Sequence, residues 1–256
     1  MAEQKITETQ VAVQLQPEAF VVVTQQEDDG DGISVESLRR VPVDALLGDI
    51  RQEIADLKYV PISITSFSIT GSVLASGVKT GNTTMEMGAV VDALTFAWAL
   101  SKAAEAVTLD GEAVDAGENG VVKSGLAITG NRKFTLAATD ERDAVSQKSV
   151  SVSFVNGIYY GAMAEGGHVD SDVLLGMVRK LQESQGTTFT VDAAGKRPVF
   201  ACPARYGTPK FVIGGFEYDW IKCATIDFTN ASGYTEAYDV WMHGQDVSGS
   251  ITVTVS

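Results

Sequence analysis

The chain has 256 residues, enough for two or three small domains, and its 45% hydrophobic and 20% charged residues are typical of folded rather than disordered protein. Thirty-three acidic against 19 basic residues give a net charge of -14, which opposes a nucleic-acid partner. No apolar run approaches the roughly 20 residues of a membrane-spanning helix, and residues 1–10 are polar, unlike a signal peptide, so we expect no membrane insertion.

The first predicted domain covers residues 1–59 and begins with a hairpin. Two short strands are expected on either side of the acidic loop 27–32, and Pro42 is placed near the start of a helix. Closely spaced aspartates with glycines could wrap a hard cation, but no Glu follows at the EF-hand offset. A solvated loop and a cation site are both open, and we assign no metal and no cofactor.

The predicted helix after Pro42 carries an apolar seam with heptad spacing. Its residues are Val43, Leu47, Ile50, Ile54 and Leu57. Because an isolated helix of this length is marginal in water, the seam must pack on something. The alternatives are the strands of its own chain and a parallel bundle of three chains.

Residues 60–155 have the period of two that predicts β-strands. In the expected strand 94–101, Leu94, Phe96, Trp98 and Leu100 alternate with small residues, which places one large apolar row on a buried face. About seven strands separated by turn signals, with a Trp in a central strand, predict an immunoglobulin-like (Ig-like) β-sandwich. Cys202 and Cys223 lie downstream, so no disulfide can join its sheets, and we expect two buried thiols in later strands.

Residues 156–256 are expected to form a β-rich domain with one amphipathic helix. Asp170 or Ser171 caps this helix and Gly186 ends it. Its apolar face is expected to comprise Val173, Leu174, Met177, Val178 and Leu181. Thirteen of the 20 aromatic residues lie between Tyr159 and Trp241, which indicates a rich core or a stacking surface.

A domain of this size leaves part of its surface exposed, so some of these aromatic rings should reach solvent. Tyr206 and Tyr234 each lie beside a glycine and are our candidates for ligand or host contact. Trp220 and Trp241 lie in predicted strands and are expected to be packed.

Catalytic motifs are absent from the sequence. His168 and His243 are far apart, and no H-E-x-x-H, G-x-S-x-G or Walker A pattern occurs. Glu217, Asp219 and Asp239 near aromatic residues leave a glycosidase as a minor alternative. We expect a protein that is not an enzyme.

Three groups of segments resemble virion proteins of bacteriophages. FVVV (20–23) and RRVPVDALL (39–47) resemble the N-terminal attachment segment of phage fibre and spike proteins. Residues 64–68, 96–102, 108–111 and 134–141 are similar to the Ig-like module of phage tail and fibre proteins. The segments 155–161, 201–207 and 228–234 are similar to the β-rich domain that often follows it.

This resemblance implies a structural component of the phage particle, in a tail fibre, a baseplate or a head fibre, that is assembled in the host cytoplasm. It also implies a homotrimer whose N-terminal segment binds another virion protein. An alternative hypothesis is a binding module whose C-terminal domain holds host surface polysaccharide or another receptor.

Overall fold

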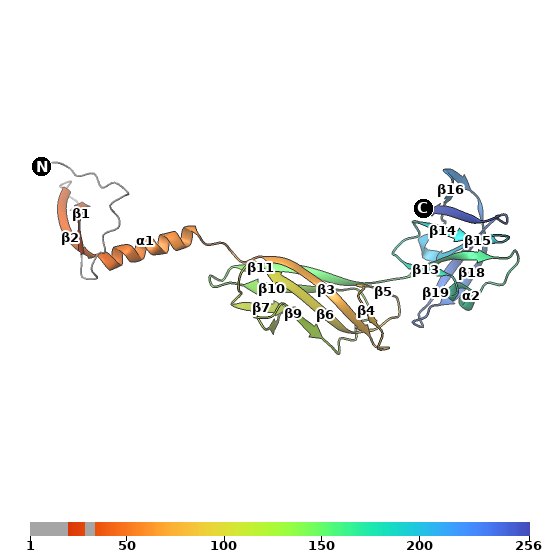
Figure 1. Cartoon of the computed structure of the whole chain (residues 1–256), viewed down its shortest axis with the longest axis horizontal. Coiled ribbons are helices and arrows are strands. Elements are labelled where there is room, and N and C mark those ends of the chain that lie inside the picture. Colours follow the sequence, from red (N-terminus) through yellow and green to blue (C-terminus); the bar gives the residue numbers. More distant parts are fainter. Residues whose placement is uncertain (1–19, 29–33) are drawn as a thin grey trace. The chain divides into compact units, whose positions relative to one another are not determined.

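The computed structural model describes residues 20–28 and 34–256, with side chains from Leu47 onward except Asp49 (Figure 1). The fold is mainly β, with several sheets and few helices, as the sequence predicts. The chain forms two compact units, and the boundary between them lies between Pro61 and Ile62. No helix in the described ranges has the length and apolarity that crossing a membrane requires.

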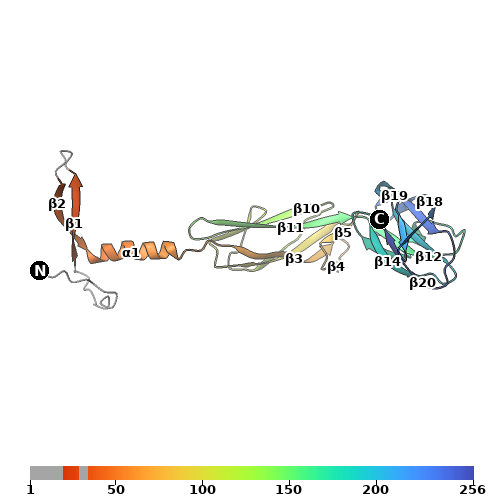
Figure 2. The ribbon, with the colours of Figure 1, turned by 90° about the horizontal axis from the view of Figure 1, so that it is seen from above.

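The N-terminal unit contains the expected hairpin and helix. β1 (Phe20–Asp28) and β2 (Ser34–Pro42) pair antiparallel and lie side by side in both views (Figure 2). α1 (Val43–Leu57) starts directly after Pro42. A proline is compatible with the start of a helix, because its φ is fixed near the helical value and the N–H it lacks is not needed there. The acidic loop falls outside the described residues apart from the backbone of positions 27 and 28, so the cation hypothesis stays a prediction.

Two sheets form the middle module, which we define as residues 62–155. The four-stranded sheet has the order β4 (Lys79–Thr80), β3 (Ile64–Leu74), β6 (Val91–Leu100) and β9 (Gly120–Lys123). The five-stranded sheet has the order β5 (Thr84–Glu86), β11 (Val145–Val155), β10 (Arg132–Thr139), β7 (Ala106–Leu109) and β8 (Glu112–Val114).

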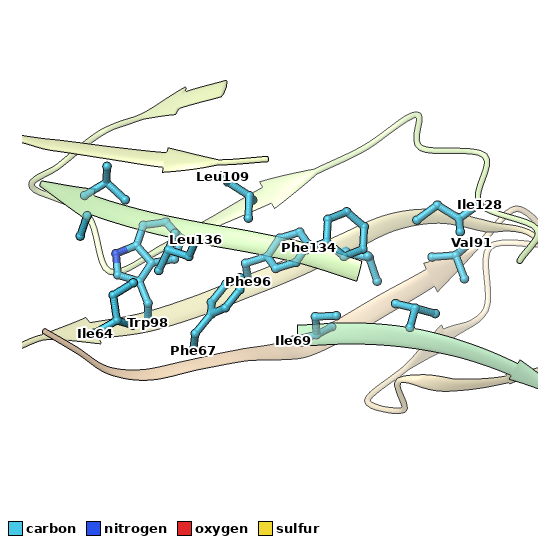
Figure 3. Packing of buried hydrophobic residues seen from close by; sticks show 14 of the residues in the cluster. Ile64, Phe67, Ile69, Val91, Phe96, Trp98, Leu109, Ile128, Phe134 and Leu136 are labelled. Atoms are coloured by element: carbon cyan, nitrogen blue, oxygen red, sulfur yellow. The ribbon is translucent and has the colours of Figure 1, made fainter. Parts of the chain in front are cut away.

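The two sheets share one core, built from the alternating apolar rows that the sequence shows. Phe96 in β6 stacks on Phe67 in β3, with ring centroids 6.0 Å apart, and meets Phe134 of the facing sheet edge-on at 5.0 Å (Figure 3). Trp98 is 3% exposed in the same core. No disulfide joins the sheets, since both cysteines lie in the next module; besides packing, Lys148 Nζ of β11 donates to the Thr65 carbonyl of β3 at 3.0 Å.

Two further sheets form the C-terminal module, which we define as residues 156–256. The five-stranded sheet has the order β13 (Val178–Leu181), β12 (Gly157–Met163), β15 (Arg197–Pro203), β19 (Thr235–His243) and β18 (Trp220–Thr229). The four-stranded sheet has the order β14 (Thr187–Asp192), β20 (Ser250–Val255), β16 (Phe211–Ile213) and β17 (Phe216–Tyr218).

The five-stranded sheet of this module is buried on both faces. Neighbouring residues of one strand enter different cores: Ile158 and Phe200 pack with the four-stranded sheet, whereas Tyr159 and Val199 pack on the other face. Leu174 from α2 (Ser171–Leu175) belongs to the second core. The concentration of aromatic residues is therefore largely a core feature.

The prediction of a long helix that begins at Asp170 or Ser171 and ends at Gly186 is wrong. Asp170 does cap a helix, since its Oδ1 accepts from the Val173 amide at 2.9 Å, but α2 ends at Leu175. Val178 to Leu181 instead form β13, which pairs with β12. Without β13 the edge of β12 would leave backbone groups unpaired, and pairing them outweighs the helical propensity of the Arg, Lys and Leu residues in this segment.

The expectation of two buried thiols is half wrong. Cys202 is buried in β15, and burial raises the pKa of its thiol to about 12. Cys223 is exposed, because it lies where the register of β18 against β19 shifts between Lys222 and Ala224.

The Trp98→Ala variant should lower the free energy of unfolding by about 3–5 kcal/mol, because it empties a core site. The measurement is calorimetric melting of the full chain. Trp98→Phe is the control: it keeps a ring in the core and removes an indole N–H that has no hydrogen-bond partner, so its loss should be smaller. An alanine variant that melts within about two degrees of the parent would contradict this role.

Candidate functional site

The middle and C-terminal modules meet without a linker. β11 ends at Val155 and β12 begins at Gly157, so Asn156 alone lies between them, and it is 1% exposed. The Asn156 side-chain amide donates to Glu236 Oε2, and its backbone carbonyl accepts from the Gln182 amide at 3.1 Å. The chain is therefore held at the point where it passes between the modules.

A buried carboxylate of the middle module makes its contacts in the C-terminal module. Glu86 is 6% exposed; its Oε1 accepts from the Tyr159 hydroxyl at 3.0 Å, and its Oε2 lies 2.6 Å from an Arg179 nitrogen. Burial, and next the nearby Glu86 charge, raise the pKa of Tyr159. We call these three residues the Glu86 latch.

A second set of contacts lies next to the Glu86 latch. Asn230 Nδ2 donates to the Met87 carbonyl at 2.8 Å, while its Oδ1 accepts from the amides of Ser232 and Tyr234. Gly88 has φ +87°, and a Cβ on it would lie 2.7 Å from Tyr234 Cβ. This loop of the C-terminal module therefore fits only against a glycine.

A groove of about 540 Å³ also runs between the modules. Asn131, Phe154 and Val155 line it from the middle module, and Glu183, Arg205 and Tyr206 line it from the C-terminal module. The Tyr206 hydroxyl donates to the Gln182 carbonyl at 3.1 Å. The Arg205 guanidinium lies 5.0 Å from the Tyr206 ring centroid and 3.1 Å from Glu236 Oε1.

Both tyrosines chosen from the sequence lie at this junction. Tyr206 is half-buried in the groove, and Tyr234 is half-buried against Gly88. Their role in ligand contact stays a prediction. Trp220 is packed as expected, 4.1 Å from the Phe211 ring, and Trp241 is half-buried.

The sequence analysis missed the most exposed aromatic ring of the C-terminal module. Phe216 is 72% exposed and Tyr218 is 44% exposed, both on β17, which pairs only with β16. Gly214 and Gly215, both with positive φ, form the turn between β16 and β17. This double glycine between apolar residues was the signal for an exposed hairpin.

The seam residues of α1 with described side chains are half-buried or exposed. Leu47 is half-buried, Ile50 and Ile54 are each 45% exposed, and Leu57 is 80% exposed. The side chain of Val43 lies outside the described residues. The four described seam residues belong to none of the hydrophobic cores formed by the residues with described side chains.

The carboxylates considered for glycoside hydrolysis differ in their surroundings. Asp239 is buried, with its Oδ1 2.7 Å from Lys222 Nζ and 2.7 Å from Thr225 Oγ1, so its charge is already compensated. Glu217 and Asp219 are exposed. In the part of the chain with described side chains, no three His, Cys, Asp or Glu residues cluster as metal ligands would. That the protein is not an enzyme stays a prediction.

Comparison with family models gave no match, and no curated protein matched the sequence. Among solved structures, the chitinase ChiA74 from Bacillus thuringiensis aligns with 11% identity and a TM-score of 0.22 over 77% of this chain. This chain spans about a quarter of that protein, 26% of its length. A likeness this low carries no argument about fold or activity.

The Gly88→Ala variant should destabilise the junction, and Gly77→Ala is its matched control. Both glycines have similar positive φ, 87° and 84°, but nothing lies within 4 Å of a Cβ on Gly77. The control should therefore lose only the strain energy, roughly 1–2 kcal/mol. Gly88→Ala should lose about 1–3 kcal/mol more through overpacking against Tyr234. Equal losses in denaturant unfolding would show that the close approach has no energetic consequence.

Stability should fall as the pH rises above about 10. The folded-state pKa of Tyr159, like that of Tyr238, is raised above the ordinary value of 10, so unfolding releases protons in this range. Thermal melting between about pH 8 and about pH 11 measures the decline. Tyr159→Phe should flatten it, whereas Tyr218→Phe, at an exposed position, should not. The same pH dependence in both variants would contradict this assignment.

Proposed function

We propose that this protein is a non-enzymatic structural component of a bacteriophage particle, such as a tail fibre, a baseplate or a head fibre. Residues 1–59 anchor it to another virion protein, and the C-terminal module is displayed. The resemblance of the N-terminal, middle and C-terminal segments to virion proteins motivates the proposal. The observation that carries it is the apolar seam of α1, whose described residues Ile50, Ile54 and Leu57 are exposed.

Self-assembly through α1 is the first part of the proposal. Leu47 and Ile54 occupy a positions of the heptad and Ile50 and Leu57 occupy d positions. Isoleucine at both kinds of position is compatible with three-stranded coiled coils. A homotrimer would bury the side chains that a single chain exposes.

Charge at the flanks of the seam supports parallel chains. Glu53 occupies a g position, and Lys58, just after α1, occupies the following e position. In a parallel coiled coil these two positions of neighbouring chains lie opposite each other, so the acid of one chain meets the base of the next. Such pairs favour a defined register more than they add stability.

The middle module fits the role of a spacer. Two sheets that face each other across one core, with Trp98 buried in the central strand β6, support its assignment as an Ig-like β-sandwich. Because the Glu86 latch and the bond from Asn230 to the Met87 carbonyl join it to the C-terminal module, this spacer would hold the displayed module in a fixed orientation.

A second candidate function is binding of a host surface glycan or another receptor by the displayed module. The exposed rings of Phe216 and Tyr218 and the groove at Tyr206 favour it, since sugar rings stack on exposed aromatic faces. Attachment of the labelled full-length protein to host cells tests this function. Unaltered attachment of a Phe216→Ala, Tyr218→Ala variant would remove β17 from the contact surface.

The double variant Ile50→Asp, Ile54→Asp should convert a trimer into monomers, because it places unpaired charges in the shared seam. Light scattering on the full chain measures the mass, and circular dichroism should show that the β-structure survives. A matched control is Gly48→Asp, Ala55→Asp, which adds the same two charges at exposed b positions outside the seam and should keep the mass of the parent. A parent protein that is monomeric at all concentrations would contradict self-assembly through α1.

A further inference from the structure

We propose that the groove between the two modules is a binding site for a neutral saccharide, to which both modules contribute. The proposal rests on the second candidate function above and deepens it, because it moves the ligand from the C-terminal module alone to the junction. The residues that line the groove are Asn131, Phe154, Val155, Glu183, Arg205 and Tyr206.

The groove is a fixed part of the fold rather than a gap between independent domains. The Glu86 latch ties the middle module to Arg179 and Tyr159, and Asn230 Nδ2 of the C-terminal module donates to the Met87 carbonyl of the middle module. A site whose walls are already held in place loses little conformational entropy when a ligand binds.

Each module supplies polar groups to the groove. Asn131 Oδ1 accepts from the Phe154 amide at 2.6 Å, which orients the side chain and leaves its amide nitrogen to donate. The Arg205 side chain is 47% exposed while it contacts Glu236, so it retains further donors. Glu183 is exposed and supplies acceptors.

The mixture of charges selects for a neutral ligand. One guanidinium, Arg205, is accompanied by the carboxylates of Glu183 and Glu236, so the groove offers no excess of positive charge to an anion. Donors and acceptors side by side match the hydroxyl groups of a sugar, each of which both donates and accepts.

An apolar floor completes the site. Phe154, which pairs with Met85 of β5, is 6% exposed, and Tyr206 adds a half-buried ring. Small-molecule sites combine such surfaces with a few placed polar groups and have volumes of about 300–1,000 Å³. At about 540 Å³ the groove lies within this range.

The test is saturation-transfer NMR of the full chain with neutral trisaccharides of glucose, galactose and N-acetylglucosamine, each at about 10 mM, above the ~1 mM Kd expected of a shallow site. We expect at least one to bind. Arg205→Ala and Asn131→Asp should each weaken it by about tenfold, through loss of hydrogen bonds to the ligand. The aspartate keeps the oxygen that accepts from Phe154.

Asn119→Asp is the matched control, since it makes the same change on the middle module outside the groove, and it should bind like the parent. Melting temperatures establish that every variant is folded. If no trisaccharide binds, or if binding survives both groove substitutions in folded protein, the proposal is overturned. The second result would leave a glycan-binding function in place at another site, and neither result bears on assembly through α1.

Discussion

The Glu86 carboxylate is the interaction on which the arrangement of the two β-modules depends. It belongs to a short strand of the middle module but finds its partners, Tyr159 and Arg179, in the C-terminal module. Burying a charge is unfavourable unless it is paired and hydrogen-bonded, so this carboxylate is compatible with only one arrangement of the modules. Its contribution is therefore to orientation more than to net stability.

Tyr159, the residue that donates to Glu86, is itself packed in the interior of the C-terminal module. Its ring meets Phe228 edge-on at 4.9 Å and Tyr238 at 6.1 Å, and the Tyr238 hydroxyl donates to the Gly157 carbonyl at 2.7 Å. The residue that receives Glu86 is thus part of a packed aromatic core, which resists displacement. The groove at Tyr206 inherits its shape from this arrangement, because its two walls belong to different modules.

The two units of the chain differ in how far they bury their large apolar side chains. The unit from residue 62 onward buries its large side chains in its own cores, whereas the helix α1 exposes Ile50, Ile54 and Leu57. An uncovered seam of this kind is unfavourable in water for a single chain. The proposed assembly through α1 would bury these three side chains.

The sequence by itself determined the elements whose pattern is local: the period of two around Trp98, the start of a helix at Asp170 or Ser171, and the hairpin and the helix that ends at Leu57. The tertiary structure decided what depends on long-range pairing. Residues 178–181 form a strand because they pair with the edge of β12. Tyr206 lies at the junction because it lines the groove with Phe154, and Tyr234 lies there because it packs against Gly88; both neighbours are distant in sequence. Neighbours of this kind leave no periodic signal, since they are set by the packing of whole sheets rather than by the spacing of residues along one strand.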